Sequence, residues 1–428
     1  MKKLFLLLTF FITHYTFLIA QQYGWVKIAT LGNQTTGLST VEFIDTLHGW
    51  TGNVFGHIAK TSDGGFNWNL SNEVGFVPKS ISMFDTLIGW AVGNQSFSDG
   101  RIYKTTNGGD LWFIQYESDY HQIFGTYTRN RLRNITSVSF DTGKTVETTN
   151  GGTNWNEHII ADSITYLGKI QFLDSLHGWI VGWTNNFPAI LRTRDGGISW
   201  DILPTPTGFG TISFIDTLNG WATRPQATFS YRTFDGGASW QRLGRIDTAD
   251  AQFDAEALSF VDSLNGWAFG NMYFQHADVG AIFHTSDGGV SWKLEYWSYS
   301  PSGFGGGQML NKHTGWAVGG GGSVLAYKSL TSVVEQLPEI PKTFSLRQNY
   351  PNPFNAQTNI EYELKQSSNV TLTIFDMKGK QVLQLINSEQ NTGVYRVRFD
   401  GTALASGTYF YTLQTNSFSD TKQMILIK

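Results

Sequence analysis

The sequence predicts an all-β fold, in which seven four-stranded units form a ring and a small β-sandwich follows. An eight-residue turn sequence returns six times at intervals of 40 to 52 residues, and each interval holds about four short apolar runs. Four strands in roughly 40 to 50 residues are typical of one blade of a β-propeller. After residue 343, six further strand-like runs separated by turn residues predict a small immunoglobulin-like sandwich.

The repeated turn is clearest at Thr285 to Trp292, with the pattern Thr, any residue, Asp or Asn, Gly, Gly, any residue, then Asn, Ser or Leu, and Trp. Asparagine cannot act as an acid or a base, but it accepts turn hydrogen bonds as aspartate does. We therefore interpret all six residues at the third position as structural. They are Asp63, Asn107, Asn150, Asp195, Asp235 and Asp287.

A second signature, a phenylalanine followed by an Asp-Thr-Leu or Asp-Ser-Leu turn and Gly-Trp, precedes most copies. In the sixth unit it predicts an inner strand at Ala257 to Val261 and a second strand at Trp267 to Gly270. The third strand is expected at Ala281 to Thr285, and Trp292 opens the fourth. Of 15 tryptophans, 13 fall at repeat positions. We therefore expect these tryptophans to pack between blades.

The last unit lacks a fourth strand of its own, because no turn-and-tryptophan copy follows the strand predicted at Ser323 to Lys328. Gly24 to Ile28 lies one period before the first repeat tryptophan. We therefore predict that the N-terminus completes the seventh blade. In the degenerate third unit we place the first turn at Phe140 to Gly143, where the tryptophan is lost.

The turn resembles the Asp-box, or bacterial neuraminidase repeat, and its pairing with Gly-Trp resembles the propeller of photosystem II assembly and stability factors. The resemblance covers residues 23–330. Asp-box propellers include sialidases, xyloglucan hydrolases, sortilin-like receptors and non-enzymatic assembly factors. The resemblance therefore implies the fold and leaves the function open.

Residues 1–20 predict a signal peptide, with Lys2-Lys3, an apolar run and Ala20 at the cleavage point, so the propeller is expected over 21–330.

The composition of the chain excludes several kinds of site. The net charge of −4 argues against nucleic-acid binding. Without cysteine there is no disulfide or thiolate metal site, and no histidine spacing indicates a metal, so we expect neither metal nor cofactor.

Variable connections between strands are where function can differ from blade to blade. Two tryptophans lie outside the repeat, and several aromatic residues accompany them in connections that this topology places on one face. The candidate ligand contacts are Trp183, Phe187, Tyr273, Phe274 and Trp297. The sixth unit has the longest connections, and we expect its acidic stretches at 247–250 and 254–256 and the segment 271–279 to be solvated loops.

The last 85 or so residues resemble the type A C-terminal sorting domain of the type IX secretion system of Bacteroidetes-like Gram-negative bacteria. A linker with two prolines, 331–342, precedes this domain at 343–428. The motif residues are Asn349, Pro351, Asn352 and Pro353, then Gly393, Tyr395, Gly407 and Tyr409, and finally Lys422 to Lys428. The resemblance implies export through the inner and outer membranes, with the type IX machinery as partner, followed by release or surface attachment.

We expect a monomeric, secreted or surface-located propeller that binds a polysaccharide or a protein without catalysis. The alternative is a secreted glycoside hydrolase like the sialidases or xyloglucanases. Arg192 and Arg232 share a repeat position with Lys60, Lys104 and His284, which favours a structural role for these arginines. The sequence shows no pair of carboxylates outside the repeat, in equivalent inward positions, that could serve as acid and base.

Overall fold

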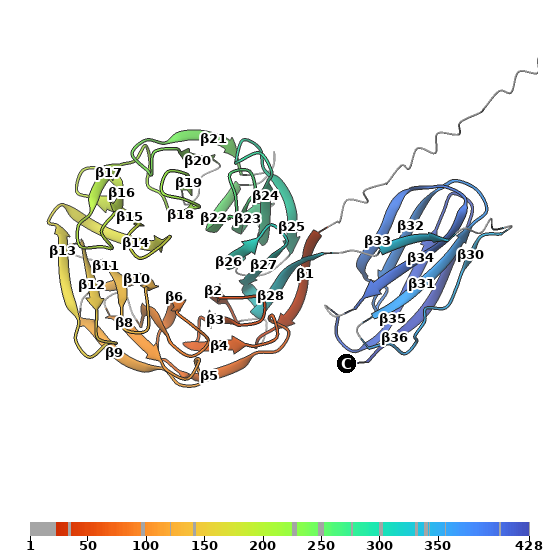
Figure 1. The fold of residues 1–428 in the computed structure, drawn as a ribbon, viewed down its shortest axis with the longest axis horizontal. Coiled ribbons are helices and arrows are strands. Elements are labelled where there is room, and N and C mark those ends of the chain that lie inside the picture. Colours follow the sequence, from red (N-terminus) through yellow and green to blue (C-terminus); the bar gives the residue numbers. More distant parts are fainter. Residues whose placement is uncertain are drawn as a thin grey trace, which may run out of the picture.

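The computed structural model describes residues 23–32, 36–95, 99–119, 121–139, 143–224, 229–246, 252–274, 277–298, 303–329, 333–337, 341, 343–355, 357–401 and 404–427. Seven four-stranded antiparallel sheets form a ring (Figure 1), and two more sheets form the C-terminal domain. The predicted all-β class, a seven-bladed propeller followed by a β-sandwich, is confirmed. The expected signal peptide lies outside the described residues, and none of their helices is long and apolar enough to cross a membrane.

Each blade is one antiparallel sheet, and in blades 1 to 6 its strands follow in chain order from the inside of the ring outward. Blades 1 to 3 are β2 (Leu38–Phe43), β3 (Gly49–Asn53), β4 (His57–Thr61) and β5 (Asn69–Glu73); β6 (Val77–Met83), β7 (Gly89–Asn94), β8 (Asp99–Thr105) and β9 (Phe113–Asp119); and β10 (Gln122–Thr128), β11 (Asn134–Ser139), β12 (Gly143–Thr148) and β13 (Asn156–Ala161). Blades 4 to 7 are β14 (Ile164–Phe172), β15 (Gly178–Thr184), β16 (Pro188–Thr193) and β17 (Asp201–Pro204); β18 (Thr211–Phe214), β19 (Gly220–Thr223), β20 (Phe229–Thr233) and β21 (Gln241–Arg245); β22 (Gln252–Phe260), β23 (Gly266–Phe274), β24 (Ala277–Thr285) and β25 (Lys293–Ser298); and β26 (Phe304–Asn311), β27 (Thr314–Gly319), β28 (Ser323–Ser329) and β1 (Tyr23–Thr30).

The N-terminal strand closes the ring, as the sequence predicts. β1 pairs antiparallel with β28, from Tyr23 opposite Ser329 to Thr30 opposite Ser323. Glu295 of the sixth blade accepts the indole N–H of Trp25, at 3.3 Å, and an indole N–H from its own blade. The seventh blade is therefore completed by a strand that begins some 300 residues earlier in the chain and is tied to its neighbour by a carboxylate.

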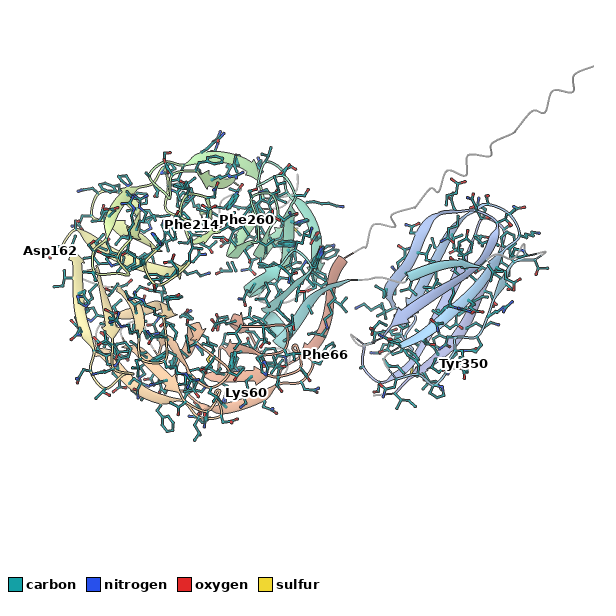
Figure 2. The ribbon with its side chains drawn as sticks, in the orientation of Figure 1. Lys60, Phe66, Asp162, Phe214, Phe260 and Tyr350 are labelled. Carbon is teal, nitrogen blue, oxygen red and sulfur yellow. The ribbon has the colours of Figure 1, made fainter. Side chains whose placement is uncertain are left out.

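Four of the six second-strand tryptophans, Trp50, Trp179, Trp221 and Trp316, tie their blade to the next one. Trp179 donates its indole N–H to the carbonyl of Gly236 in the turn of blade 5, at 3.0 Å. The phenylalanine of the next inner strand stacks on the same indole: the ring centroids of Phe214 and Trp179 are 3.9 Å apart, and those of Phe260 and Trp221 are 4.0 Å apart. Figure 2 shows the positions of Phe214 and Phe260 in the ring. Equivalent N–H bonds join Trp50 to Gly108, Trp221 to Gly288 and Trp316 to Gly64. In these four blades, burial of the indole ring together with a hydrogen-bonded N–H explains why the two signatures occur together.

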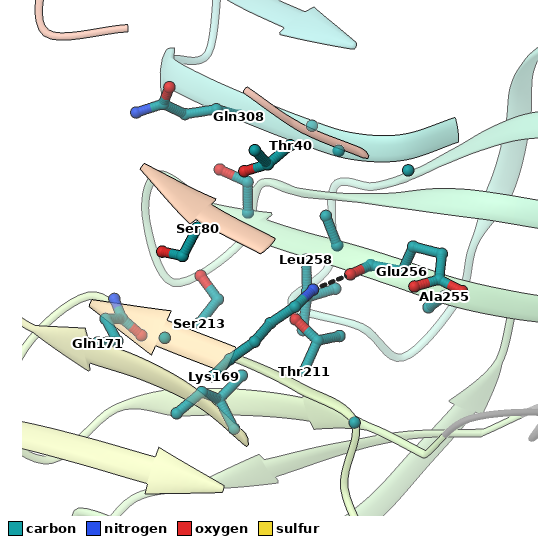
Figure 3. A pocket seen from close by; sticks show the side chains of 18 of the residues that line it. Thr40, Ser80, Lys169, Gln171, Thr211, Ser213, Ala255, Glu256, Leu258 and Gln308 are labelled. Carbon is teal, nitrogen blue, oxygen red and sulfur yellow. Dashed lines mark hydrogen bonds between the residues drawn. The ribbon is translucent and has the colours of Figure 1, made fainter. Parts of the chain in front are cut away.

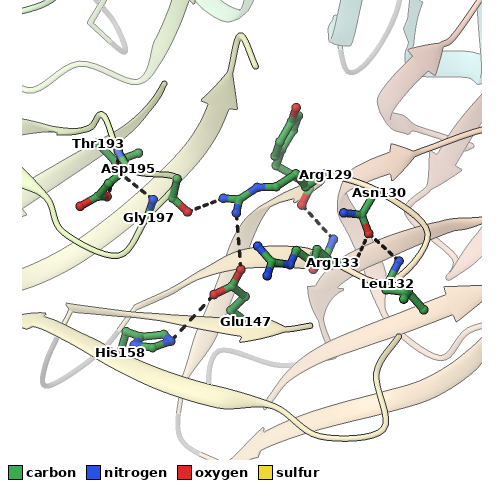
Figure 4. Close-up of polar contacts among 12 residues, drawn as sticks. Arg129, Asn130, Leu132, Arg133, Glu147, His158, Thr193, Asp195 and Gly197 are labelled. Carbon is green, nitrogen blue, oxygen red and sulfur yellow. Dashed lines mark hydrogen bonds and ion pairs between the residues drawn. The ribbon is translucent and has the colours of Figure 1, made fainter. Parts of the chain in front are cut away.

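Blade 3 lacks this tryptophan and uses an arginine in its place. Ile135 takes the tryptophan position, since it lies opposite Glu147 as Trp50 lies opposite Lys60. Arg129 donates to the carbonyl of Gly196 in the turn of blade 4 (Figure 4). Its guanidinium lies 3.8 Å from Glu147, which leaves the arginine charge paired. Arg129 thus supplies the bond between blades that an indole N–H supplies in four other blades.

Our placement of the first turn of blade 3 at Phe140 to Gly143 is wrong. The turn lies between β10 and β11, where Asn130 Oδ1 accepts the N–H groups of Leu132 and Arg133 at 2.8 and 3.0 Å. Gly143 opens β12, and residues 140–142 lie outside the described part of the chain. In this turn asparagine replaces the usual aspartate, and arginine replaces the usual small residues. The turn therefore keeps its hydrogen bonds but loses its sequence signature.

The C-terminal domain is a sandwich of two sheets, and each of its six predicted strands is present. One sheet has the order β29 (Val333–Leu337), β34 (Gly393–Asp400), β31 (Gln357–Leu364) and β30 (Ser345–Leu346); the other has β33 (Gln381–Gln390), β32 (Ser368–Phe375), β35 (Gly407–Gln414) and β36 (Ser419–Leu426). Part of the expected linker 331–342 is therefore a strand, because β29 pairs with β34. The β-branched residues Val333 and Val334 of this segment precede Pro338, so they can join a sheet.

Candidate functional site

The aromatic residues expected to contact a ligand lie mainly at strand ends instead of in loops. Trp183 is next to the end of β15, Tyr273 and Phe274 close β23, and Trp297 lies near the end of β25. Phe187 lies in the turn before β16. The exposed fractions of Trp183, Tyr273 and Trp297 are 44%, 44% and 51%, and that of Phe187 is 38%. The side chain of Phe274 lies outside what the structure describes.

The segment 271–279, expected to be a loop, is a continued hairpin. β23 and β24 stay in register as far as Phe274 opposite Ala277. Tyr273 also lies opposite Gln252 of β22, and Trp183 lies opposite Tyr166 of β14. Both aromatic residues are therefore at the end of their blade where the second strand leads to the third.

Trp183 combines exposure with a packed underside. A methyl group built on Gly208 would come within 2.0 Å of its ring, so the indole lies directly against the connection that leads to blade 5. Only glycine leaves room for the ring at that position. Trp183 therefore has one face held by the protein and retains substantial exposed surface.

The inner strands of all seven blades line a polar cavity of about 770 Å³. Its wall carries serine, threonine and glutamine side chains together with four charged residues, Lys79, Lys169, Asp254 and Glu256. Figure 3 shows Lys169 reaching from β14 toward β22, with Thr211 of the intervening blade near its stem. The cavity is therefore the place where charged side chains of different blades meet.

A β-bulge recurs in the inner strands of six blades. The register of β2 shifts between Leu38 and Thr40, and those of β6, β10, β14, β22 and β26 shift at the corresponding place. The residues at these shifts that line the cavity, here called the bulge ring, are Ser39, Lys79, Phe124, Lys169, Glu256 and Gly305. A bulge re-aims a side chain out of the regular pleat. The ring differs chemically in nearly every blade, so it is the variable part of a repetitive scaffold.

Lys169 is the most unusual member of the bulge ring. Its ammonium donates to the main-chain carbonyl of Glu256 across blade 5 (Figure 3). Burial lowers the pKa of Lys169 below its ordinary value; the carboxylate of Glu256 acts in the opposite direction, and the ammonium of Lys79 adds to the lowering. Burial penalises the charged form, so this cation is incompletely compensated.

Sequence reasoning missed the two carboxylates of the cavity. We expected residues 254–256 to be a solvated acidic loop, but they belong to β22, and Asp254 and Glu256 line the cavity. The available signal was alternation, because the buried Phe253 and Ala255 alternate with the polar residues Gln252, Asp254 and Glu256. The other acidic stretch, 247–250, lies outside the described residues.

The six turn positions interpreted as structural share one set of contacts. The hydroxyl of Thr285 donates to Asp287 Oδ1 at 2.8 Å, and the same oxygen accepts the N–H of Ser291 at 2.9 Å. Asn107 and Asn150 accept the corresponding N–H groups at 3.0 and 2.9 Å. Burial acts to raise the pKa of Asp287, but hydrogen bonds from Ser291 and Thr285 outweigh it and hold the pKa below its ordinary value. Asp63, Asp195 and Asp235 make the same bonds.

The described residues offer few combinations of side chains that could bind a metal ion. They contain no group of three histidine or carboxylate residues that could hold a metal ion. The two histidines of the first turns, His48 and His177, are each 2.8 to 2.9 Å from the aspartate of their own turn.

The opening motif of the C-terminal domain clamps its last strand. Asn352 Oδ1 accepts the N–H of Ile425 at 2.8 Å, and Phe354 exchanges two main-chain bonds with Ile425 and Ile427, both at 2.9 Å. Asn349 is buried, and its amide donates to the carbonyl of Pro351 at 3.0 Å. Two motifs that stand some 70 residues apart in the sequence therefore form one structural unit at the edge of β36. Pro353 lies between the clamp residues, and Lys428 lies outside the described residues.

The two middle motifs have the same local structure. Tyr395 donates its hydroxyl to the carbonyl of Asn391 at 2.7 Å, and Tyr409 donates to the carbonyl of Ala405 at 2.9 Å. In both cases the acceptor lies four residues upstream, across the glycine that opens the strand, Gly393 or Gly407. Lys422 of the terminal motif lies 3.4 Å from Asp420.

Comparison with known proteins identifies the tail and supports the fold. Residues 348–428 match the family described as "Secretion system C-terminal sorting domain". No curated protein matches the chain. Among solved structures, it is similar to YCF48 from Cyanidioschyzon merolae (18% identity, 71% of this chain and 99% of that one, TM-score 0.56). It is also similar to YCF48 bound to D1 peptide (19%, 72% and 96%, 0.53) and to a streptogramin B lyase (11%, 72% and 97%, 0.55).

Because these solved structures share less than 20% of their residues with the chain, the similarity to them shows the fold alone. The chain is thus a β-propeller that carries, over residues 348–428, a C-terminal sorting domain of the type IX secretion system, which implies export followed by secretion or attachment at the cell surface.

Proposed function

We propose that the exported propeller is a binding protein without catalytic activity. It holds an extracellular polysaccharide or protein on the face that carries Trp183, Tyr273 and Trp297. The observation that carries the proposal is their exposure, 44% to 51%, whereas the six second-strand tryptophans are at most 2% exposed. Burying a large aromatic ring is favourable, so a ring that stays exposed in the free protein is a candidate contact for a ligand.

The fold by itself does not choose between binding and catalysis. One similar propeller has been solved with a bound peptide, and another is a lyase. The choice therefore rests on the side chains of this chain. Aromatic rings at the ends of blades 4 and 6 offer flat apolar surfaces for sugar rings or for a partner's side chains, and each such contact contributes roughly 1–3 kcal/mol to binding.

The test is the double substitution Trp183→Ala and Trp297→Ala. A glycan array and a screen of surface-protein extracts with the wild-type chain identify the ligand, and titration then measures the dissociation constant. Loss of about 2 kcal/mol corresponds to roughly thirtyfold weaker binding. The melting temperature should stay nearly constant, because both rings are about half exposed in the free protein.

Phe113→Ala provides the matched control, since this ring is 53% exposed on the outer strand β9, away from the proposed face. It should leave the dissociation constant unchanged. A double variant that melts at lower temperature yet binds normally would assign both tryptophans to packing and contradict the proposal.

The alternative function, a secreted glycoside hydrolase, is favoured by one observation. Asp254 and Glu256 both line the cavity, and glycosidases generally use two carboxylates as acid and as base or nucleophile. The chain should be screened for hydrolysis beside Asp254→Asn and Glu256→Gln. Turnover of a glycan that disappears in either variant would replace the binding proposal with the enzymatic one.

A further inference from the structure

The cavity has a cationic side and an acidic side. Lys79 of β6 and Lys169 of β14 lie on either side of blade 3, close enough for the charge of Lys79 to act on Lys169, and Asp254 and Glu256 lie on β22. Blade 5 separates the two sides, and its inner strand is regular and only four residues long. Lys169 spans this short strand to reach the main chain of Glu256 (Figure 3).

The ammonium of Lys169 keeps capacity for another partner. A lysine ammonium has three N–H donors, and the carbonyl of Glu256 accepts one of them. Among the described residues Lys169 and Lys79 form no ion pair, and Lys169 is only partly buried, so its ammonium can be reached from the cavity. An incompletely compensated cation in a polar cavity is stabilised by an anion that enters it.

We propose that the bulge ring binds a sugar acid, the uronate residue of an extracellular polysaccharide. Its carboxylate lies against Lys169 and Lys79, and its hydroxyl groups donate to Asp254 and Glu256. This inference rests on the proposed function in one respect, because it takes the polysaccharide as the ligand.

A uronate fits this charge arrangement better than other anions do. Phosphate or sulfate carries no ring of hydroxyl donors, and Asp254 and Glu256 repel a dianion. A neutral sugar leaves the lysine charges unmatched. The volume of about 770 Å³ lies within the range of small-molecule sites and has room for a short oligosaccharide.

Calorimetric titration of the full chain with trigalacturonate and with its methyl ester tests the inference, because esterification removes the charge and keeps the ring. The acid should bind at least tenfold more tightly than the ester. Lys169→Met keeps the length of the stem and removes the ammonium, so it should abolish this difference. Lys293→Met, at an exposed position of the outer strand β25, should preserve the difference.

Thermal unfolding of each variant separates binding from folding. Lys79→Met adds a second variant at an exposed position, where folding is not at risk, and should reduce the preference for the acid. Equal affinity of acid and ester, absence of binding by both, or a preference that survives in Lys169→Met would overturn the inference. If the ester binds and depends on Trp183 and Trp297 but not on Lys169, the proposed function stands and only the uronate site fails.

Discussion

Glu42 stands in a ring of polar side chains that join the inner strands. Glu42 Oε2 accepts the N–H of Met83 in the next blade at 2.8 Å. Gln171 and Gln308 make the equivalent bond to Phe214 and Phe43, and their amide groups also donate to the carbonyl of the same residue. Glutamate can imitate this two-point contact only when it is protonated. We therefore predict that Glu42→Gln stabilises the propeller at neutral and alkaline pH.

The magnitude follows from the pKa of Glu42, which burial raises from 4.5 to about 8 against the opposing hydrogen bond from Met83. A group whose folded pKa is raised stabilises the fold below its unfolded pKa, and this contribution is lost as pH rises toward the folded pKa. At about 1.36 kcal/mol per pKa unit, the wild type loses at most roughly 5 kcal/mol between pH 4.5 and 8. The free energy of unfolding of Glu42→Gln lacks this dependence on pH. The two proteins should therefore be similarly stable at pH 4.5 and differ most in stability at pH 8 and above.

Urea unfolding at several pH values, followed by tryptophan fluorescence, measures this difference. All 15 tryptophans precede residue 330, so the signal reports the propeller alone. Gln308→Glu is the reciprocal variant, and it should acquire a pH slope of the same sign. Parallel stability curves for wild type and Glu42→Gln would refute the reasoning, since they would show that Glu42 titrates alike in the folded and unfolded states.

Two other predictions concern the ends of the chain. Deleting residues 23–30 removes β1 and leaves one edge of β28 unpaired. The free energy of unfolding should therefore fall by roughly 3–5 kcal/mol. A melting temperature within about a degree or two of that of the intact protein would contradict the closure of the ring by β1. Asn352→Ala removes the acceptor for the N–H of Ile425 and should increase the fraction of protein retained in the periplasm. Immunoblotting of cell fractions measures this retention. The control Asn387→Ala, at an exposed position of β33, should not change it. Equal retention of the two variants would show that the clamp has no part in sorting.

The sequence was sufficient for the architecture because packing between blades imposes the same residues in every unit. Trp179 and its equivalents fill the same space in their blades, and four of them donate to the same turn carbonyl of the next blade, so the period is visible in the residues themselves. The prediction failed in blade 3, where Arg129 and Ile135 fill that space with unrelated side chains. A pattern search detects a repeated residue, whereas the structure requires only a repeated contact.

The candidate site was less accessible to sequence reasoning. Trp183 and Trp297 were found because they break the repeat. The bulge ring was not found, since a bulge is a shift in pairing between two strands and has no fixed residue type: the position holds Ser39, Phe124 and Gly305 as well as lysine and glutamate. Nor does a sequence show that Lys169 and Glu256, in blades 4 and 6, meet across the cavity.

Closure by the N-terminal strand sets an order of events during biogenesis. β1 is synthesised before every other strand of the propeller, whereas its partner β28 follows about 290 residues later. Bringing the ends of so long a segment together costs conformational entropy, and until then the first strand has an unpaired edge that other chains can join. Until β28 is available, β1 therefore has no strand to pair with in its own sheet, and a chaperone that binds the unfolded chain would protect that edge.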